Sequence, residues 1–227
     1  MIREFEVYWM GRVEYGDALR LQRERAAARI RGTVQDGLLL GEHPPVVTLG
    51  RGAKREHLLS DEQALKTRGI EIWEVERGGD VTVHCPGQLV GYPVVDLTTH
   101  GKDLHLFVRN LEEVVIRTLG VYGIQAERSP GRTGVWVQGA KIASIGVHIS
   151  RWVSRHGFAL NVSTDLGFFD LIVPCGLTGV RVVSMTGLLG CDVGIQAVAG
   201  SIAIEFGRVF DCTPQWQVRP EVALSLP

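Results

Sequence analysis

Four short apolar runs follow one another between two amphipathic segments, and this pattern limits the possible folds more than any other feature of the chain. The runs cover residues 124–127, 134–137, 142–149 and 158–162. Short apolar runs bounded by turn residues are typical of buried strands, and an unbroken series of them predicts consecutive antiparallel strands. We therefore expect this part of the chain to build one continuous region of sheet.

Helices are predicted on both sides of these strands. Apolar residues recur every three or four positions in 104–119 and again in 195–210, which is the spacing of one buried helix face. A third segment, 15–31, is rich in Ala, Leu and Arg and is also predicted to be helical. Runs of strands with a few helices between them favour an α+β fold in which helices cover a mixed, mostly antiparallel sheet.

The N-terminal half adds further short elements. Strands are predicted over residues 2–9, 37–42, 45–49, 70–76 and 81–84. Gly78 and Gly79 separate the last two of these strands, and a glycine pair between two such segments predicts a hairpin. Ser60 and Gln63 have the spacing of a capping box, which predicts a short helix that ends at residue 67.

The composition is that of a globular protein. The chain has 227 residues, of which 45% are hydrophobic and 22% charged, and its formal net charge is −1. We expect one catalytic domain over residues 1–212 and a loosely held tail over residues 213–227, where proline occurs and periodicity is weak. A net charge near zero argues against broad binding to nucleic acid, which needs a basic excess.

The sequence also indicates a cellular location and the absence of bound metal. Its first residues are charged throughout, unlike a secretory signal, and no apolar run has the length of a membrane span. We therefore expect a cytoplasmic protein with no membrane partner. The four cysteines, at positions 85, 175, 191 and 212, form no C-x-x-C pair, so we expect reduced thiols and neither a zinc ribbon nor a redox dithiol. No metal and no cofactor are expected.

One lysine and one cysteine are candidate catalytic groups. Cys175 lies between Pro174 and Gly176, which would present its thiol at a bend, and Lys141 precedes an apolar run that would partly desolvate its stem. An ammonium beside a thiol favours the thiolate, which is the form that attacks acyl groups. The alternatives are a buried structural thiol at Cys175 and a solvated lysine at the end of a strand.

A glycine-rich turn and the strand after it form a second candidate site. Gly78 and Gly79 open this stretch, and glycines let a ligand approach the backbone closely, although an ordinary hairpin is the alternative. His84 and Cys85 are neighbours on the strand and therefore point to opposite faces, so we reject a Cys-His pair there. Cys85 is expected to be a packing residue, and His84 remains a candidate for substrate binding.

Several motifs, in order along the chain, resemble those of one enzyme family. The segments are HPPVVTLGR, RGGDVTVHCPGQLVGYPVVDL, GRTGVWVQGAKIASIGVHISRWVSRHGFALNVSTDL and the later Pro-Cys-Gly. They are similar to the octanoyl-ACP:protein N-octanoyltransferase family, also called lipoate-protein ligase B, and the resemblance extends to about Gly176. It implies a biotin/lipoate-ligase-like fold and transfer of an octanoyl group from acyl carrier protein to a lysine of a lipoyl domain.

The resemblance implies roles for individual residues. The cysteine at the Cys175 position carries the acyl group as a thioester, and the lysine at the Lys141 position keeps that cysteine ionised. From the chemistry itself we expect Lys141, or a water that it holds, to accept a proton from the acceptor amine, and N–H groups near Cys175 and Gly176 are candidate donors to the oxyanion. Ile145 and Phe158 are expected to line a tunnel for the eight-carbon tail. The implied contacts to the acyl substrate are Arg77, Gly78, Gly79, Asp80, Val81, Thr82, Val83, His84, Ser144, Ile145, Gly146, Gly157, Phe158 and Ala159.

Two positions depart from the family pattern. Val83 stands where the family usually has Tyr, which removes a hydroxyl. Cys85 stands where the family usually has Gly, and it adds a side chain and a second thiol near the acyl-binding turn. Neither change affects the positions of Lys141 and Cys175.

The resemblance also implies partners. The donor is octanoyl-acyl carrier protein, and the acceptors are the apo lipoyl domains of 2-oxoacid dehydrogenase E2 subunits and the glycine cleavage H protein. Arg51, Lys54 and Arg55 form a local basic loop that would dock the acidic carrier, and a merely solvated loop is the alternative. Two other functions stay open: an ATP-dependent lipoate-protein ligase, which uses a lysine but no cysteine nucleophile, and a non-catalytic acyl-binding protein.

Overall fold

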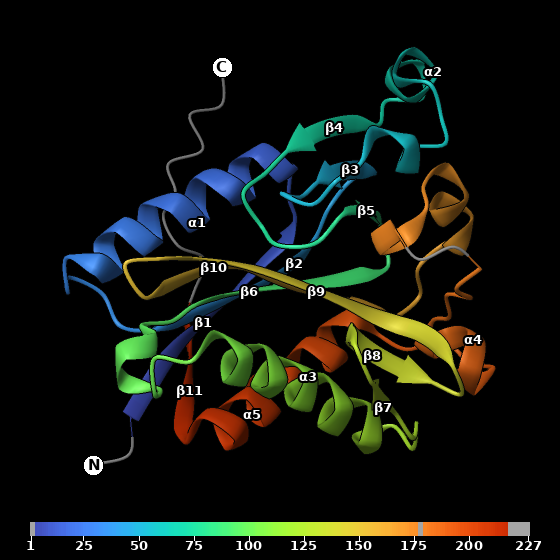
Figure 1. Ribbon diagram of the computed structural model, residues 1–227. Coiled ribbons are helices and arrows are strands. Elements are labelled where there is room, and N and C mark those ends of the chain that lie inside the picture. Colours follow the sequence, from blue (N-terminus) through green and yellow to red (C-terminus); the bar gives the residue numbers. More distant parts are fainter. Residues whose placement is uncertain (1–2, 177–178, 218–227) are drawn as a thin grey trace.

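Two β-sheets of unequal size organise the chain, and helices cover both faces of the larger one (Figure 1). The computed structural model describes residues 3–176 and 179–217, and no helix in those ranges is long and apolar enough to cross a membrane. Within them the strands are β1 (Arg3–Arg12), β2 (Gly37–Glu42), β3 (Val46–Leu49), β4 (Glu71–Glu74), β5 (Val81–His84), β6 (Gln88–Val94), β7 (Glu127–Ser129), β8 (Arg132–Val137), β9 (Ala140–Ser150), β10 (Val153–Asn161) and β11 (Cys212–Gln217). The α-helices are α1 (Tyr15–Ile30), α2 (Glu62–Thr67), α3 (Leu104–Val121), α4 (Met185–Leu189) and α5 (Ile195–Phe210). Short 3-10 helices are η1 (Arg55–His57), η2 (Leu97–Thr99), η3 (Leu166–Leu171) and η4 (Pro174–Gly176).

The larger sheet is mostly antiparallel. Among the described residues it has eight strands, in the order β11-β1-β2-β6-β10-β9-β8-β7, and only β1 runs parallel to its neighbours. The predicted series of antiparallel strands is present as β7 to β10. The first of them begins only at Glu127, because the N–H of Ile124 bonds to the carbonyl of Leu119 and closes the end of α3. The predicted α+β class with a mixed, mostly antiparallel sheet is confirmed.

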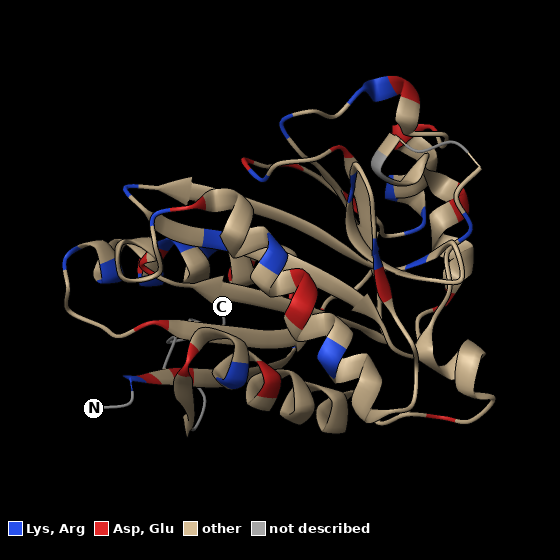
Figure 2. Ribbon diagram, turned by 60° about the horizontal axis from the view of Figure 1, so that its bottom comes forward, with Lys and Arg blue, Asp and Glu red and all other residues tan. Residues whose placement is uncertain are grey.

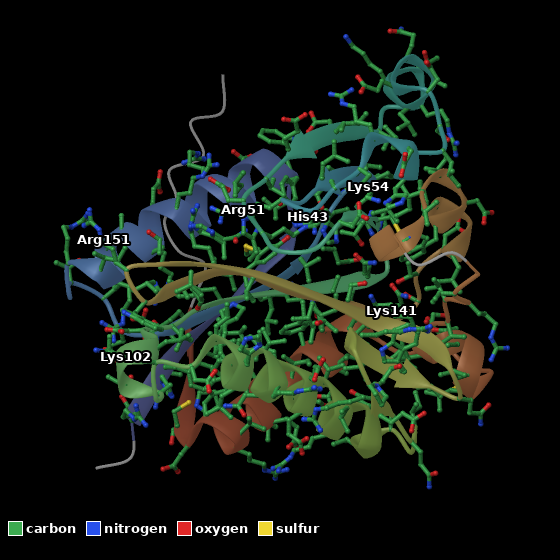
Figure 3. All side chains as sticks on the ribbon, in the orientation of Figure 1. His43, Arg51, Lys54, Lys102, Lys141 and Arg151 are labelled. Carbon is green, nitrogen blue, oxygen red and sulfur yellow. The ribbon has the colours of Figure 1, made fainter. Side chains whose placement is uncertain are left out.

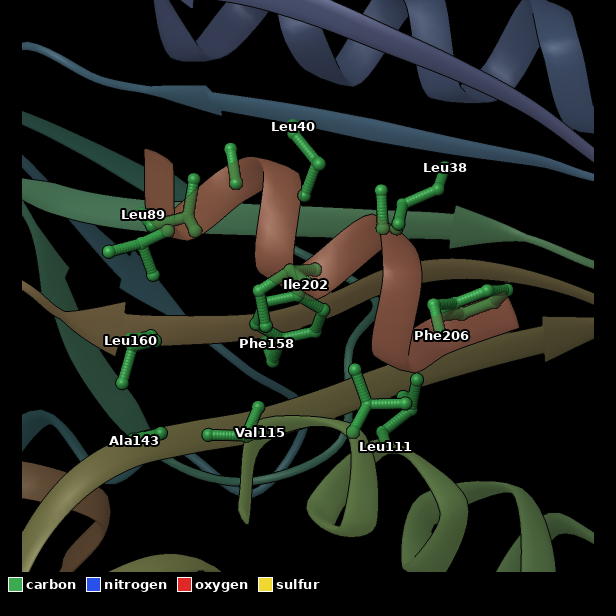
Figure 4. Close-up of a cluster of buried hydrophobic side chains, with 14 of the residues drawn as sticks. Leu38, Leu40, Leu89, Leu111, Val115, Ala143, Phe158, Leu160, Ile202 and Phe206 are labelled. Atoms are coloured by element: carbon green, nitrogen blue, oxygen red, sulfur yellow. The ribbon is translucent and has the colours of Figure 1, made fainter. Parts of the chain in front are cut away.

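The main core lies between this sheet and helices α3 and α5 (Figure 4). The apolar residues whose three- and four-residue spacing predicted both helices are the ones that are buried in this core. The predicted bounds of α5 are those observed. Burial of each large apolar side chain stabilises the folded state by roughly 1.5–3 kcal/mol relative to leaving it exposed. Side chains from both layers in Figure 4 are Leu38, Leu40, Leu89, Phe158, Leu111, Val115, Ile202 and Phe206.

Helix α1 covers the opposite face of the larger sheet, next to the small sheet (Figure 1). Ala18 of α1 packs with Leu39, Val90 and Ala159 of the larger sheet. The first turn of the same helix packs against the small sheet, where Tyr15 lies in one cluster with residues of β3 and of the loop after β4. Helix α1 therefore joins the two sheets on the side away from the main core.

The predicted hairpin over residues 70–84 is wrong. Strands β4 and β5 are not paired, because β3 lies between them, parallel to β4 and antiparallel to β5. The N–H of Gly78 instead donates to the carbonyl of Val147 on β9. The glycine turn therefore connects the small sheet to the larger one.

The predicted cap of α2 is also corrected. The helix begins at Glu62, and its N-cap is Asp61, whose carboxylate accepts hydrogen bonds from the N–H groups of Gln63 and Ala64. Ser60 lies one residue too early to fill this role. Asp and Ser are both good N-caps, so the choice between them depends on where the chain enters the helix.

The C-terminal segment does not match the expected loosely held tail. Residues from Cys212 to Gln217 form β11 and pair in parallel with β1. Pro214 is tolerated because β11 is an edge strand, where a missing N–H need not bond to a neighbour. Residues 218–227 of the expected tail lie outside the described part of the chain.

Candidate functional site

A pocket lies where the glycine turn and β5 meet β9, β10 and the start of α1. Every residue expected to contact the acyl substrate lines this pocket except Val81 and Val83. The fold thus brings together three runs that are far apart in the sequence: Arg77, Gly78, Gly79, Asp80, Thr82 and His84; Ser144, Ile145 and Gly146; and Gly157, Phe158 and Ala159.

Val81 and Val83 do not line the pocket because they face the other side of β5. Both are fully buried in a cluster with Val47 and Leu65, while the alternate residues Thr82 and His84 reach the pocket. The substitution at Val83 is therefore a matter of packing.

Cys85 is the packing residue that the sequence predicted. Its side chain is completely buried, does not line the pocket, and places Sγ 3.9 Å from the backbone oxygen of Asp165. Burial, and to a lesser extent Asp165, raises the pKa of the Cys85 thiol to about 12. A thiol that stays protonated at neutral pH is a poor nucleophile, so Cys85 is inert.

Three pocket residues were missed in the sequence: Tyr15, Tyr92 and His156. Tyr92 donates its hydroxyl proton to Nε2 of His43 across 2.6 Å, and Nδ1 of His43 donates to the carbonyl of Val13 across 2.7 Å. The carbonyl fixes this tautomer because it can only accept. Tyr92 and His156 lie inside the motifs quoted above but were not singled out there, and Tyr15 lies in none of them. Only the tertiary fold places the three side by side.

The imidazoles around the pocket are neutral at physiological pH. Burial lowers the pKa of His43 to about 4 and that of His84 and His156 to about 3, and the nearby positive charge of Arg77 adds to the effect at His84 and His156. Burial likewise raises the pKa of Tyr15 to about 12. These side chains offer hydrogen bonds without charge, which suits an apolar ligand because burying an uncompensated charge beside it is costly.

The guanidinium of Arg77 holds the glycine turn against the small sheet. Its Nη2 donates to the carbonyl and hydroxyl oxygens of Thr48 at 2.7 and 2.8 Å, and its Nη1 donates to the carbonyl of Gly78 at 3.1 Å. Arg77 is itself mostly buried. It therefore lines the pocket and at the same time fixes the position of the turn.

Lys141 is buried on β9, with only 4% of its surface exposed (Figure 3). Its Nζ lies 5.6 Å from the centre of the Trp136 ring, on the neighbouring strand. The stem of Lys141 passes close to Gly134, where any other residue would clash. A Cβ there would lie 2.9 Å from Cε of Lys141 and 2.6 Å from the carbonyl oxygen of Ala143, and the φ of Gly134 is 126°. The alternative of a solvated lysine at a strand end is excluded by this burial.

A chain of hydrogen bonds links the pocket to the strand of Lys141. Nδ1 of His84 donates to Gln88 at 2.7 Å, and Gln88 donates to Asn161 at 2.9 Å. Asn161 in turn donates to the carbonyl of Val183 at 3.1 Å, and the N–H of Val183 donates to the carbonyl of Lys141 at 3.0 Å. The polar wall of the pocket and the backbone of Lys141 therefore form one connected unit.

The backbone of Cys175 lies in η4, which packs against β5, while its side chain lies outside the described residues. The segment is anchored before and after this bend. The N–H of Val173 donates to the carbonyl of His57 at 2.7 Å, and after η4 the chain returns along β9, where the N–H of Lys141 donates to the carbonyl of Arg181 at 2.8 Å. The predicted bend at Pro-Cys-Gly is thus packed against β5, and the segment around Arg181 that follows it lies beside the strand of Lys141.

The basic loop near the glycine turn is partly neutralised. Lys54 lies 3.8 Å from Glu56, and Arg55 lies 2.5 Å from Glu62. Arg51 is exposed, and its backbone N–H donates to the carbonyl of Arg77. Basic and acidic residues are interspersed on the face in Figure 2, as the near-zero net charge implies.

Comparison with known proteins identifies the family. The family model described as the lipoyl protein ligase A/B catalytic domain matches residues 14–207. An octanoyltransferase of Solibacter usitatus (strain Ellin6076) is 52% identical over 202 residues, which cover 89% of this chain and 91% of that protein. A lipoate-protein ligase A bound with ATP superimposes with a TM-score of 0.76 at 19% identity, over 97% of this chain and 90% of that one. A bipartite lipoate protein ligase from Thermoplasma acidophilum gives 0.75 at 20% identity, over 96% and 88%.

The two structural matches show a shared fold and confirm the predicted ligase-like architecture. The sequence match is far closer and extends over nearly the whole of both chains. The protein therefore belongs to the lipoyl protein ligase A/B catalytic domain family, as an acyltransferase of its octanoyltransferase group.

Proposed function

We propose that this protein transfers an octanoyl group from octanoyl-acyl carrier protein to the lysine of an apo lipoyl domain, through a thioester on Cys175. One observation carries the proposal: Lys141 is buried on β9 and bonds through its backbone to the segment that follows the Pro-Cys-Gly bend. The acceptors proposed are the lipoyl domains of 2-oxoacid dehydrogenase E2 subunits and the glycine cleavage H protein.

The first step forms the acyl-enzyme. The Cys175 thiolate, stabilised by the Lys141 ammonium, attacks the thioester carbonyl of the carrier, and the C–S bond to pantetheine breaks as the bond to Cys175 forms. The departing pantetheine sulfur takes up a proton. Because one thioester replaces another, the step needs no ATP.

The second step transfers the acyl group to an amine. The neutral amine of the acceptor lysine attacks the Cys175 thioester, an amide forms, and Cys175 leaves as a thiolate. The N–H of Gly176 donates to the carbonyl of Val173 at 3.1 Å, so it acts as an oxyanion donor only if that bond is shared or released. The proton acceptor expected from the sequence is Lys141, or a water that it holds.

The pocket is suited to the octanoyl tail. Gly146, Gly157 and Ala159 present little bulk to it, and its imidazoles and phenols are neutral. The charged residues in the lining are Arg77 and Asp80. Ile145 and Phe158 line the pocket and also pack against the main core, which holds the wall in place. Each methylene buried there would contribute about 0.8 kcal/mol, so the depth of the pocket would select the chain length.

The test is acyl transfer without ATP. Purified protein, octanoyl-acyl carrier protein and an apo lipoyl domain are mixed, and octanoylation is followed by the gel shift of the lipoyl domain. We expect transfer by the natural protein, no transfer by Cys175→Ser and a large loss in Lys141→Ala. Cys191→Ser, at an exposed cysteine, is the matched control. A strict need for ATP and free acid would contradict the proposal and favour a ligase.

A further inference from the structure

An imidazole and a carboxylate are paired close to the bend that carries Cys175, and the two steps above do not use them. Nδ1 of His57, the last residue of η1, lies 2.5 Å from Oδ2 of Asp80. Both side chains are mostly buried, with 16% and 13% of their surfaces exposed. Oδ1 of Asp80 accepts hydrogen bonds from the N–H groups of Val81 at 2.8 Å and Lys54 at 3.2 Å. The carboxylate is therefore fixed by the backbone on one oxygen and orients the imidazole with the other.

This pairing sets the tautomer of His57. A carboxylate oxygen only accepts, so Nδ1 of His57 carries a proton, and in the neutral ring the lone pair is on Nε2. Among the described residues Nε2 has no hydrogen-bond partner. An imidazole held in this way by a carboxylate is able to take up a proton at Nε2, and the carboxylate stabilises the imidazolium that results.

The pair lies between the acyl pocket and the Cys175 bend. Asp80 lines the pocket. A Cβ on Gly176 would lie 2.5 Å from Oδ2 of Asp80 and 2.9 Å from Cε1 of His57, so the backbone just after Cys175 rests against the ring edge between Nδ1 and Cε1. The carbonyl of His57 also accepts the N–H of Val173, on the other side of Cys175. The imidazole is therefore anchored next to the backbone of the bend that carries Cys175.

The second step needs a general base, and Lys141 in its ammonium form is unsuited to that role. The attacking amine must lose a proton, and the sulfur that leaves must be stabilised as a thiolate. An ammonium at Lys141 stabilises that thiolate, but an ammonium has no lone pair with which to accept a proton. One group cannot fill both roles at the same moment.

We propose that His57, oriented by Asp80, is the general base for transfer to the acceptor lysine, an inference that rests on the function proposed above. As the C–N bond forms and the C–S bond breaks, the bonding pair goes to the Cys175 sulfur beside the Lys141 ammonium. The amine proton goes to Nε2 of His57. The imidazolium faces the Asp80 carboxylate and then releases the proton to water, which restores the starting state.

The experiment separates the two steps. Acyl-enzyme formation from octanoyl-acyl carrier protein is timed by intact-protein mass spectrometry, and isolated acyl-enzyme is then mixed with an apo lipoyl domain in a single turnover. In His57→Gln we expect acylation to stay within a few-fold of the natural rate and transfer to fall by about 10²–10⁴-fold at pH 7. In His57→Ala, added imidazole restores part of the transfer rate. His105→Gln, at an exposed histidine on α3, changes neither step.

Each outcome has a distinct meaning. If His57→Gln slows acylation and transfer equally and imidazole restores nothing, the pair only holds the bend and the proposal is overturned. Unchanged transfer in His57→Gln overturns it as well. If the natural protein gains no acyl mass, the proposed function itself fails and the assignment of His57 fails with it.

Discussion

At the scale of single residues, the site depends on places where a side chain is missing. Gly134 lets the stem of Lys141 pass beside the backbone of the neighbouring strand, and Gly176 lets the Cys175 bend rest against Asp80 and His57. Both have φ in the left-handed range, at 126° and 67°, where other residues are strained. The position of the buried Lys141 therefore depends on the absence of a side chain at Gly134.

Gly134→Ala is expected to displace Lys141 without removing it. The new Cβ would clash with Cε of Lys141 and with the carbonyl of Ala143, and a shift of about 1 Å in a catalytic group costs up to about 10²-fold in rate. Acylation measured by intact mass should therefore fall strongly. Gly120→Ala is the control, since Gly120 is exposed on α3 with nothing near it, and it should raise the free energy of unfolding by up to about 1 kcal/mol. Equal acylation rates in the two variants would count against this role of Gly134.

Most of the site could be located from the sequence motifs. Each of the three segments that line the pocket lies within a motif that is recognisable on its own. The alternation of side chains along a strand would have been enough to exclude Val81 and Val83 from the expected substrate contacts, since Thr82 and His84 occupy the opposite face of β5. No sequence pattern marked Tyr15 or His57, and Tyr92 lies in a quoted motif but was not singled out within it. Each sits in an ordinary helix, strand or loop segment, and only tertiary packing gives it a neighbour in the site.

At the scale of elements, long periodic segments were predicted well and pairings were not. The bounds of α5 follow from its apolar spacing, whereas the hairpin over residues 70–84 was wrong because β3, which comes earlier in the chain, inserts between β4 and β5. A glycine pair predicts a turn but not the partner of the strand that follows. Here the turn bonds to β9, and this contact builds one wall of the pocket.

The cap of α2 gives a test at this scale. Asp61→Ala removes the acceptor for two N–H groups of the first turn and should lower stability by about 1 kcal/mol. Ser60→Ala should change it by a few tenths at most, since Ser60 lies before the cap. Urea unfolding of both variants against the natural protein measures the difference. A larger loss of stability in Ser60→Ala than in Asp61→Ala would instead support the capping box that was expected from the sequence.

At the scale of the whole molecule, burial of three neutral histidines between the sheets couples stability to pH. His43, His84 and His156 have folded-state pKa values of about 4, 3 and 3, below the ordinary value near 6.5. The unfolded chain therefore binds more protons than the folded one between these values, and stability falls as the pH drops from about 6.5 toward 4. The loss is up to about 1.4 kcal/mol per pH unit for each histidine.

Urea unfolding at pH 7.5 and pH 5.5 checks this coupling. The natural protein should lose stability on acidification, and His43→Gln should lose less because one titrating group is gone. His105→Gln, at the exposed histidine, should keep the natural slope. Parallel slopes in His43→Gln and the natural protein would show that His43 does not contribute.

Docking of the acyl carrier is also a property of the whole surface. Arg51 is exposed and bonds through its backbone to Arg77, at the glycine turn that lines the pocket, whereas Arg151 lies at the β9–β10 turn, at the far end of β9 from Lys141 (Figure 3). If the acidic carrier docks at the pocket, Arg51→Glu should raise the KM for octanoyl-acyl carrier protein several-fold, more at low salt than at high salt. Arg151→Glu should leave the KM unchanged. Equal effects of the two reversals would remove the Arg51 loop from the interface.

In the proposed reaction, Cys175 holds the acyl group between donor and acceptor. The most direct measurement is intact-protein mass spectrometry after brief mixing with octanoyl-acyl carrier protein, followed by peptide mapping of the modified cysteine. We expect one added octanoyl group on the peptide that contains Cys175, lost again when an apo lipoyl domain is added. An unmodified protein that still octanoylates the lipoyl domain, or an acyl group found on another residue, would contradict it.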